Sequence, residues 1–361
     1  MALEKEEMNP FDRVTAALKG EPTDRVPIGW LGRREVGFGL PQVTVADVVR
    51  EKSGYKLYKG IKAMVERFHP DMIAVMTYTT VEAVAMGTKD KYFADQLPAP
   101  IDYAVKSPED LEKTKIPDPR VDGDLPCLYN AVKKVSNEFS GQVPIGAGTV
   151  GPFSVGARIR GLWDISFDIM RRPWFAHDVV KHATEACMNI IEGFREAGAT
   201  GTSSGAGSET VLGIEHFRQF CVPYERMYHR KAKKLGYLSM SRHICSGPSA
   251  DLVIDEFPKF GFDNLPILVW GYYKDAQTMQ QKKKLFTEYA PAVAVGGTLR
   301  ASDELFYGTP AQVEAESVKL LDVCSPGGHY FHMADCCIPP TTPLENLDAF
   351  VISAKKYRPK A

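Results

Sequence analysis

The sequence lacks any apolar run near the roughly 20 residues that a membrane-spanning helix requires. Its first residues, Met1 to Met8, are rich in charge and lack the apolar core of a secretory signal. We therefore expect a protein that stays in the cytoplasm and makes no contact with a membrane.

An excess of charge of one sign is also missing, because 44 lysine and arginine residues face 45 aspartate and glutamate residues. The resulting net charge of −1 gives no long-range attraction toward nucleic acid or anionic lipid. Nucleic acid is therefore not an expected partner.

A disulfide framework is the third absence. The chain has seven cysteines, an odd number, and thiols are kept reduced in the cytoplasm. The cysteines are therefore expected to be free, and those near strand ends become candidates for metal binding.

No low-complexity linker divides the 361 residues, and short apolar runs alternate with longer helical patterns. This alternation is typical of repeated β-α units around a parallel sheet. We predict an α/β protein, a (β/α)8 TIM barrel in which residues 1–361 form a single domain. The eight candidate strands are Arg25–Trp30, Met72–Met76, Val143–Gly148, Ala199–Ser203, Leu238–His243, Leu265–Val269, Ala292–Val295 and Gly328–Met333.

Two segments lie outside the regular β-α pattern. Asn9 is expected to cap an N-terminal helical extension that begins at Pro10 and ends at Gly20. The stretch around residues 89–140 is rich in proline and charge and fits no clean β-α unit. We interpret it as an excursion from the barrel.

Three helical stretches carry clear signals later in the chain. A long helix is predicted over Trp174–Glu196, where apolar residues recur at helical spacing. Pro223 is expected to kink or divide the stretch Ile214–Lys234. The residues Thr342-Pro343-Leu344-Glu345 have the pattern of a capping box that starts the last helix.

Metal-ligand residue types occur at the carboxyl ends of two of the predicted strands. His243 and Cys245 are separated by one residue, so they point to the same side of an extended backbone. Cys336 follows the last predicted strand, and the carboxyl ends of barrel strands share one rim. One imidazole and two thiolates suit Zn²⁺ and leave a coordination position open for substrate.

The same residues have an ordinary structural interpretation. A His-x-Cys pair is frequent by chance, and a cysteine near a strand end often fills space in a core. Cys337 also competes with Cys336 for the role of ligand. Spacing alone does not decide between these interpretations.

Several longer segments carry a family resemblance. The chain resembles the uroporphyrinogen decarboxylase superfamily over nearly its whole length, and within it the zinc-dependent corrinoid methyltransferases. The resemblance rests on Asn9–Pro27, Val81–Gly87, Gly151–Ser154 with Arg160-Gly161, the His-x-Cys of His243–Cys245, and Cys336–Asn346. It implies the TIM-barrel fold without reference to the strand count.

The resemblance also implies a ligand set. It implies that Zn²⁺ is held by His243, Cys245 and Cys336, with Cys337 aligned to a glycine that usually follows the ligand cysteine. In the family an acidic residue often lies in the strand after His-x-Cys, but the corresponding stretch Asp263–Trp270 is apolar where that acid is expected. Water or another side chain is then left to fill the open position.

The implied activity is transfer of a methyl group between corrinoid cobalt and a small O- or S-methyl compound. An Asp-x-His-x-x-Gly motif for cobalamin is missing from the sequence, so the corrinoid is expected on a partner protein or as free cofactor. Residues that bind this cofactor are not assigned. The candidate catalytic or substrate-binding residues are Glu82, Tyr78, Glu209 and His332.

Three substrate classes remain open. Aromatic residues expected near the barrel mouth suit an aromatic methyl ether as well as the docking of a corrin. These residues are Trp30, Phe93, Tyr272, Tyr273, Phe306 and Tyr307. The departures from the family pattern favour the ether, and thus O-demethylation, over a coenzyme M-type thiol. A tetrapyrrole decarboxylase is the alternative activity, but Trp30–Arg34 lacks the arginine-rich motif that such enzymes carry near their N-terminus.

Overall fold

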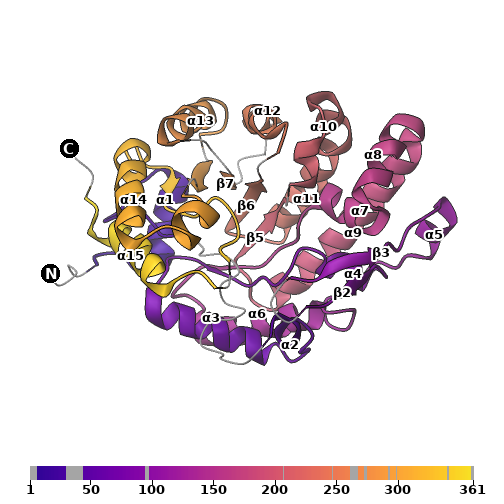
Figure 1. Ribbon diagram of the computed structural model, residues 1–361, viewed down its shortest axis with the longest axis horizontal. Helices are drawn as coiled ribbons and strands as arrows, with labels where there is room; N and C mark the ends of the chain where they lie inside the picture. The colour runs from indigo at the N-terminus through magenta and orange to yellow at the C-terminus, as the bar shows by residue number, and fades with distance from the viewer. Residues whose placement is uncertain are drawn as a thin grey trace.

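Seven parallel strands form the central sheet, in the order β1-β4-β5-β6-β7-β8-β9 (Figure 1). The computed structural model describes residues 6–29, 44–93, 97–205, 207–245, 247–260, 267–271, 275–291, 293–297, 299–339 and 341–358. The strands are β1 (Ile73–Ala74), β4 (Ile145–Gly146), β5 (Gly201–Ser204), β6 (Ser239–Ile244), β7 (Ile267–Gly271), β8 (Ala294–Gly297) and β9 (Tyr330–Phe331).

The segment around Ile28 closes this sheet into a barrel. Ile28 forms a parallel bridge with His332, directly after β9, and Gly29 N donates to His332 O at 2.9 Å. On its other side, Asp71 N donates to Ile28 O at 3.0 Å, just before β1. The predicted (β/α)8 barrel is therefore confirmed, with this segment in the eighth strand position.

Each predicted strand corresponds to an observed strand or bridge, but several bounds differ: β8 begins at Ala294, two positions after the predicted start, and β1 and β9 are each two residues long. Two segments differ in more than their bounds or lie partly outside the described residues. Arg25–Trp30 pairs through a single bridge at Ile28 instead of forming a regular strand, and Trp30 lies outside the described residues. β7 begins at Ile267, two positions after the predicted start at Leu265, which also lies outside them. Both segments had the least distinct apolar alternation in the sequence.

Helices surround the strands in an outer layer (Figure 1). The longer ones are α3 (Tyr55–Phe68), α6 (Leu125–Phe139), α9 (Pro173–Glu196), α11 (Val222–Lys234), α13 (Ala276–Tyr289), α14 (Pro310–Cys324) and α15 (Leu344–Lys356). Shorter helices are α1 (Pro10–Lys19), α2 (Val45–Val49), α4 (Val81–Ala85), α5 (Pro108–Lys113), α7 (Pro152–Arg160), α8 (Leu162–Arg171), α10 (Ile214–Phe220) and α12 (Ala250–Glu256). Within the described ranges, no helix has the length and hydropathy needed to span a membrane.

The predicted start and end of the first helix and the predicted division of Ile214–Lys234 are confirmed. The Asn9 side chain accepts a hydrogen bond from Asp12 N at the start of α1, and Gly20 ends the helix with a φ of 72°. The stretch that contains Pro223 divides at Cys221 into α10 and α11. Proline thus occupies the first turn of α11, where its missing N–H costs no helical hydrogen bond.

The predicted capping box before the last helix is wrong. α15 begins at Leu344 with Pro343 as its N-cap residue, and no side chain caps it. The Thr342 hydroxyl is buried and has no hydrogen-bond partner in the described part of the chain. Thr342 lies one residue before the N-cap position, too early to meet the free N–H groups of the first turn.

The excursion from the barrel is shorter than predicted. Lys89–Lys91 (β2) and Ala99–Asp102 (β3) form an antiparallel pair outside the main sheet, followed by α5. The helix α6, however, packs against α3 and β4 and belongs to the outer layer. The 89–140 excursion therefore ends where α6 begins, near residue 125.

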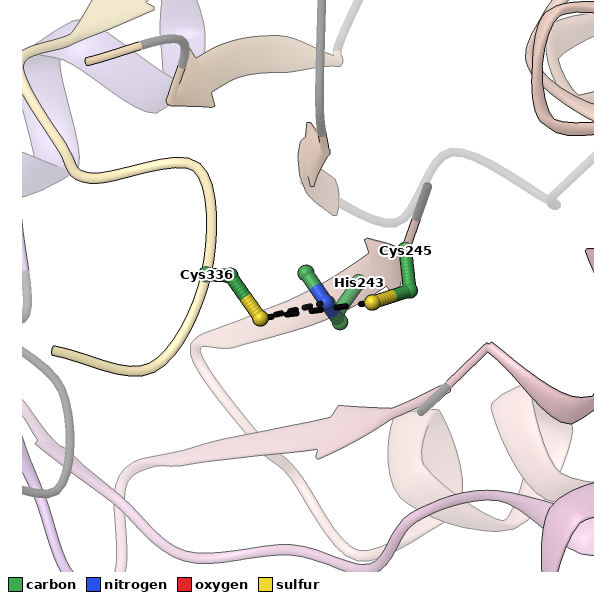
Figure 2. A group of neighbouring side chains, drawn as sticks. All are labelled: His243, Cys245 and Cys336. Carbon is green, nitrogen blue, oxygen red and sulfur yellow. Dashed lines mark hydrogen bonds between the residues drawn. The ribbon is translucent and has the colours of Figure 1, made fainter. Parts of the chain in front are cut away.

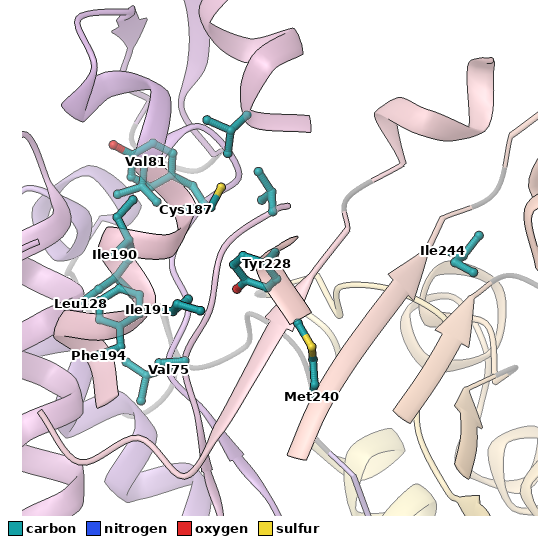
Figure 3. Close-up of a cluster of buried hydrophobic side chains, with 14 of the residues drawn as sticks. Val75, Val81, Leu128, Cys187, Ile190, Ile191, Phe194, Tyr228, Met240 and Ile244 are labelled. Carbon is teal, nitrogen blue, oxygen red and sulfur yellow. The ribbon is translucent and has the colours of Figure 1, made fainter. Parts of the chain in front are cut away.

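The main hydrophobic core lies between the strands and the outer helices. Figure 3 shows Ile190, Ile191 and Phe194 of α9 gathered beside Leu128 of α6 and Val75. All three α9 side chains are fully buried. Each buried side chain of this size contributes about 1.5–3 kcal/mol, which holds the long helix against the barrel wall.

A buried ion cluster joins α1 to the point where the barrel closes. The Asp71 carboxylate accepts from Arg13 Nη1 and Arg25 Nη1, each at 2.6 Å, and from Ile28 N at 2.7 Å. Arg13 and Asp71 are completely buried. A charge in this position is tolerated only because every partner is present.

His332 is a second buried ionisable group, next to the same closing segment. Its ring stacks on Phe350 with centroids 4.3 Å apart, and both ring nitrogens have no hydrogen-bond partner among the described residues. Burial lowers the pKa of His332 to about 3. The imidazole is therefore neutral in the folded protein at neutral pH.

We predict that Asp71→Asn destabilises the fold by about 3–5 kcal/mol, because two buried arginines lose their shared countercharge. The matched control is Asp348→Asn, which breaks an exposed pair with Arg67 and should cost less than about 1 kcal/mol. Urea unfolding followed by circular dichroism measures both. Equal losses in the two variants would contradict the role given to Asp71.

We predict that His332 makes the fold sensitive to acid. The unfolded imidazole takes up a proton below about pH 6.5, whereas the folded one does so only near pH 3, so stability is lost as the pH falls through this window. Between pH 7 and pH 5 the loss is roughly 2 kcal/mol. His332→Leu should remove that part of the pH slope and leave the slope above pH 7 unchanged, which urea titrations at each pH test.

Candidate metal centre

Strand β6 presents two alternating faces, and the candidate metal-ligand residues share one of them. Met240, Arg242 and Ile244 are buried, whereas Ser241 and His243 are partly exposed. Because side chains alternate along a strand, Cys245, directly after β6, continues the face of His243. The apolar alternation of the sequence thus aims an imidazole and a thiol toward the barrel mouth.

Cys336 reaches the same place from the loop after β9. Ala334 forms a parallel bridge with Leu299, and Asp335 N donates to Leu299 O at 2.8 Å. These contacts fix the loop beside the end of β8. The next residue, Cys336, is then held over the mouth toward β6 (Figure 2).

The three side chains converge in a geometry that fits a divalent metal ion. Cys336 Sγ lies 4.0 Å from Cys245 Sγ and 3.9 Å from His243 Nε2, and the three donor atoms all lie within 4.8 Å of one another. Figure 2 shows the two sulfurs turned toward each other beside the imidazole. Tetrahedral Zn²⁺ requires sulfur–sulfur separations of about 3.8 Å, so small side-chain movements would complete the site.

A glycine makes room for one of the sulfurs. Gly207 has a φ of 85°, and a Cβ built on it would lie 2.6 Å from Cys245 Cβ. Any other residue at this position would be strained and would displace Cys245. Gly207, which follows β5, therefore allows close contact with Cys245.

A buried charge network supports β6 from the side opposite the metal donors. Arg242 donates to Glu209, and its Nη1 lies 3.8 Å from Glu225 Oε1. All three side chains are almost completely buried. The paired charges fix the strand residue that precedes His243, so they position the imidazole without touching the metal site.

Glu209 and Glu82 are both engaged in structural contacts. One Glu209 oxygen accepts from Arg242 and the other accepts from Ser154 Oγ at 2.9 Å. Glu82 Oε1 accepts from Val150 N at 2.9 Å, near the end of β4. Both carboxylates are almost fully buried, and neither belongs to the group of donor atoms around His243.

Tyr78 lies after β1 in a second polar cluster. Its hydroxyl donates to Asp124 Oδ2 at 2.7 Å and lies 3.4 Å from the Tyr92 hydroxyl. Burial, with the nearby Asp124 charge, raises the pKa of Tyr78 well above its usual range. Tyr78 therefore keeps its proton at neutral pH.

His332 packs against Phe350 of α15, as described above, and it is completely buried. It does not belong to the converging donor group.

Cys337 is partly exposed, but its sulfur is not in the converging donor group, which contains Cys336 instead. Of the aromatic residues expected near the mouth, Trp30, Tyr272 and Tyr273 lie outside the described residues. The stretch Asp263–Trp270, in which the family's acidic residue was expected, is described only from Ile267 onward.

Asp335 is a neighbour of the site that the sequence analysis missed. Burial raises the pKa of Asp335 to about 6, against the opposing effects of a hydrogen bond from Ala301 N and the nearby His243. It precedes Cys336 directly, so an acidic residue next to a candidate ligand was the available signal.

Comparison with known proteins gives one family match over nearly the whole chain. The family described as Uroporphyrinogen decarboxylase (URO-D) matches residues 9–357. This range contains all three converging donors and both segments that close the barrel.

Relatives with the same sequence identity to this chain have names that describe two different activities. The methylcobamide:CoM methyltransferase MtbA of Methanosarcina mazei is 25% identical, over 98% of this chain and 99% of that protein. A uroporphyrinogen decarboxylase of Myxococcus xanthus is also 25% identical, over 92% of each chain. A solved methyltransferase structure from Methanosarcina mazei superposes with a TM-score of 0.82 at 21% identity, covering 97% of this chain and 99% of that one.

We predict that the purified chain contains about one zinc per molecule and that Cys336→Ala loses it, because two remaining donors bind zinc far more weakly. The matched control is Cys337→Ala, which removes the adjacent thiol and should retain the metal. Elemental analysis measures the zinc content. Loading with Co²⁺ provides a second measurement, since thiolate coordination gives intense near-ultraviolet absorption that should weaken only in Cys336→Ala. Retention of zinc by Cys336→Ala would overturn the assignment.

Proposed function

The chain belongs to the uroporphyrinogen decarboxylase family, and on that premise we propose that it is a zinc-dependent methyltransferase. It transfers a methyl group between the cobalt of a corrinoid and a small O- or S-methyl compound. The zinc is held by His243, Cys245 and Cys336.

The convergence of these three donors is the observation that carries the proposal. Decarboxylation of a tetrapyrrole requires groups that bind carboxylates, and it gives no reason to gather two thiols and an imidazole at the barrel mouth. Relatives with both names share 25% identity with the chain, so overall similarity does not separate the two activities. The donor set favours the methyltransferase over the decarboxylase.

The reaction is a displacement at the methyl carbon. In one direction cobalt(I) supplies the electron pair, the carbon–oxygen or carbon–sulfur bond breaks, and the leaving group departs with that bond's electrons. In the other direction a thiolate attacks methyl-cobalt(III), and cobalt(I) departs. When bound, zinc supplies positive charge that stabilises the thiolate or the developing oxygen anion.

The donors determine how strong this effect is. Two thiolates carry two negative charges, which balance the two positive charges of the ion, and the neutral His243 imidazole adds none. A centre of near-zero charge favours a nucleophilic thiolate and stabilises an oxygen anion less. An ether substrate would therefore benefit from a proton donor. Tyr78 is not suited to that role, because its raised pKa makes its hydroxyl a weaker acid and its proton is donated to Asp124.

Two substrate classes follow from different observations. The names of the methyltransferase relatives favour coenzyme M, a thiol, as the methyl acceptor. The aromatic residues in the sequence favour an aromatic methyl ether, and Tyr307, which is 78% exposed, is a described member of that set. We propose the aromatic ether as the first class to test and the thiol as its alternative.

The corrinoid is proposed to arrive on a partner corrinoid protein or as the free cofactor, because this chain lacks the Asp-x-His-x-x-Gly motif. We propose that the enzyme works in the cytoplasm. Both cysteine ligands must remain reduced to hold zinc, and cytoplasmic redox systems maintain that state.

We predict methyl transfer that depends on the metal donors. Cobalt(I) corrinoid is mixed with the enzyme and methoxyarenes, or methylcobalamin is mixed with the enzyme and coenzyme M, and the cobalt absorbance is followed. The wild-type chain should convert one of these pairs, and Cys336→Ala should be slower by at least about a hundredfold because the charge that stabilises the leaving or attacking group is lost.

Cys337→Ala serves as the matched control and should keep wild-type rates. Uroporphyrinogen is supplied in a parallel assay. Release of carbon dioxide from it, with no methyl transfer in either direction, would show that the decarboxylase alternative is correct.

A further inference from the structure

Helix α7 is enclosed by its neighbours except at one arginine. Eight of its nine residues are buried, and Arg158, whose side chain is half-buried, is the exception. The helix packs against α4, α8, α9 and α11, and against the short 3-10 helix Ser208–Val211 that follows β5 (Figure 1). Solvent therefore reaches α7 mainly at the Arg158 side chain, so this charge lies in an opening between packed elements.

The Arg158 guanidinium contacts the loop that follows β5. Its Nη1 donates to Ser208 Oγ at 3.1 Å and to Ser154 O at 3.0 Å. A guanidinium has five N–H donors, and these two contacts use one of its three nitrogens. Ser208 directly follows Gly207, the residue that packs against Cys245. The two hydrogen bonds thus hold a positive charge one residue away from a contact with a candidate metal ligand.

This charge lies within reach of the metal centre. α7 begins after β4, at the rim where the parallel strands end. Two consecutive residues, with Cα atoms about 3.8 Å apart, connect the two contacts, so Arg158 Nη1 lies no more than about 14 Å from Cys245 Cβ. A small molecule whose reacting atom lies at the metal can therefore reach the guanidinium with a group at its other end.

Asp90 of β2 is an acidic residue whose charge acts on the same region. One of its oxygens accepts from the Thr80 hydroxyl, and the other has no hydrogen-bond partner among the described residues. Burial raises the pKa of Asp90, while the Thr80 hydrogen bond and the Arg158 charge act in the opposite direction. Asp90 is thus neutralised more easily than an ordinary aspartate, which weakens its competition with an anion at Arg158.

The charge of the metal centre also favours an anion at this position. Zn²⁺ with two thiolates and a neutral imidazole has a charge near zero, so the donors do not repel a negatively charged molecule. The guanidinium adds one positive charge beside them. Guanidinium groups bind oxyanions through paired N–H···O bonds, which select both charge and orientation.

We propose that Arg158 determines substrate specificity by binding an anionic group, a carboxylate or a sulfonate, at the end of the substrate opposite the reacting atom. The inference rests on the proposed function and names the class of molecule that the site accepts. With an aromatic ether the anion is a carboxylate on the ring, and with a thiol it is a sulfonate. Because this group is remote from the reacting atoms, it binds equally in substrate and transition state, and its loss acts on KM.

Matched substrate pairs test the proposal. Methoxybenzoate and neutral methoxybenzamide form the ether pair, and 2-mercaptoethanesulfonate and 2-mercaptoethanol form the thiol pair. The wild-type chain should convert the anionic member of one pair with a kcat/KM at least about tenfold higher. Arg158→Gln should lower that value by about 10- to 100-fold through KM, because a charged hydrogen bond is lost, and should leave the neutral member within about twofold. Arg158→Lys keeps the charge and should retain part of the preference.

Arg171→Gln is the matched control, because it removes the same charge from an exposed position on α8. It should leave the kcat/KM of both members unchanged. Circular dichroism verifies that all variants are folded. If Arg158→Gln slowed the anionic and neutral members equally, the residue would only support the loop at Ser208, and the specificity role would be overturned.

Calorimetric titration of the two anionic molecules separates this inference from the proposed function. Absence of methyl transfer with every pair, together with anion binding that Arg158→Gln weakens by about tenfold or more, would contradict the methyltransferase and support the anion site. Equal conversion of both members of each pair by the wild type would overturn the anion site although methyl transfer stands. Failure of the wild type to bind either anion, or binding that Arg158→Gln leaves unchanged, would overturn it as well.

Discussion

Closure of the barrel is the constraint on which the rest of the molecule depends, and the Asp71 carboxylate maintains it. This one group joins Arg13 of α1, Arg25 and the backbone of Ile28, so the segment between β9 and β1 is held in the ring. Once the ring is closed, every parallel strand ends at the same rim. Cys336 can then meet His243 and Cys245 although many residues separate them in sequence. The donor group at the mouth is thus a consequence of an ion cluster elsewhere in the barrel.

The sequence predicted the elements whose signal is local. Apolar alternation located most strands, and Pro223 correctly indicated the division between α10 and α11. Features that depend on an exact residue position or on tertiary neighbours were harder to predict from the sequence. The capping box at Thr342 failed because helix α15 starts one residue later than that pattern requires. Proline and charge in the 89–140 stretch concealed α6, whose apolar side chains become meaningful only when α3 and β4 are placed beside them.

The site shows the same division between local and tertiary information. The spacing of His243 and Cys245 predicted that they share a face, but spacing could not choose Cys336 over Cys337. That choice depends on the Asp335–Leu299 hydrogen bond, which sets the direction of the loop after β9. Gly207 and Asp335 were missed for a related reason. Their importance comes from atoms that lie next to them in space, which are Cys245 beside Gly207 and the Ala301 N–H and His243 near Asp335.

The two faces of strand β6 have different roles: one holds a buried charge network, and the other holds the candidate metal donors. The buried side holds Arg242 between Glu209 and Glu225, and removing Arg242 would leave two buried carboxylates without this shared countercharge. The mouth side holds donors that are only partly buried and can change without that cost. A family built in this way can keep its barrel and its buried network while the mouth residues vary. Relatives of equal identity with different names are then expected, and the side chains at the mouth decide the reaction.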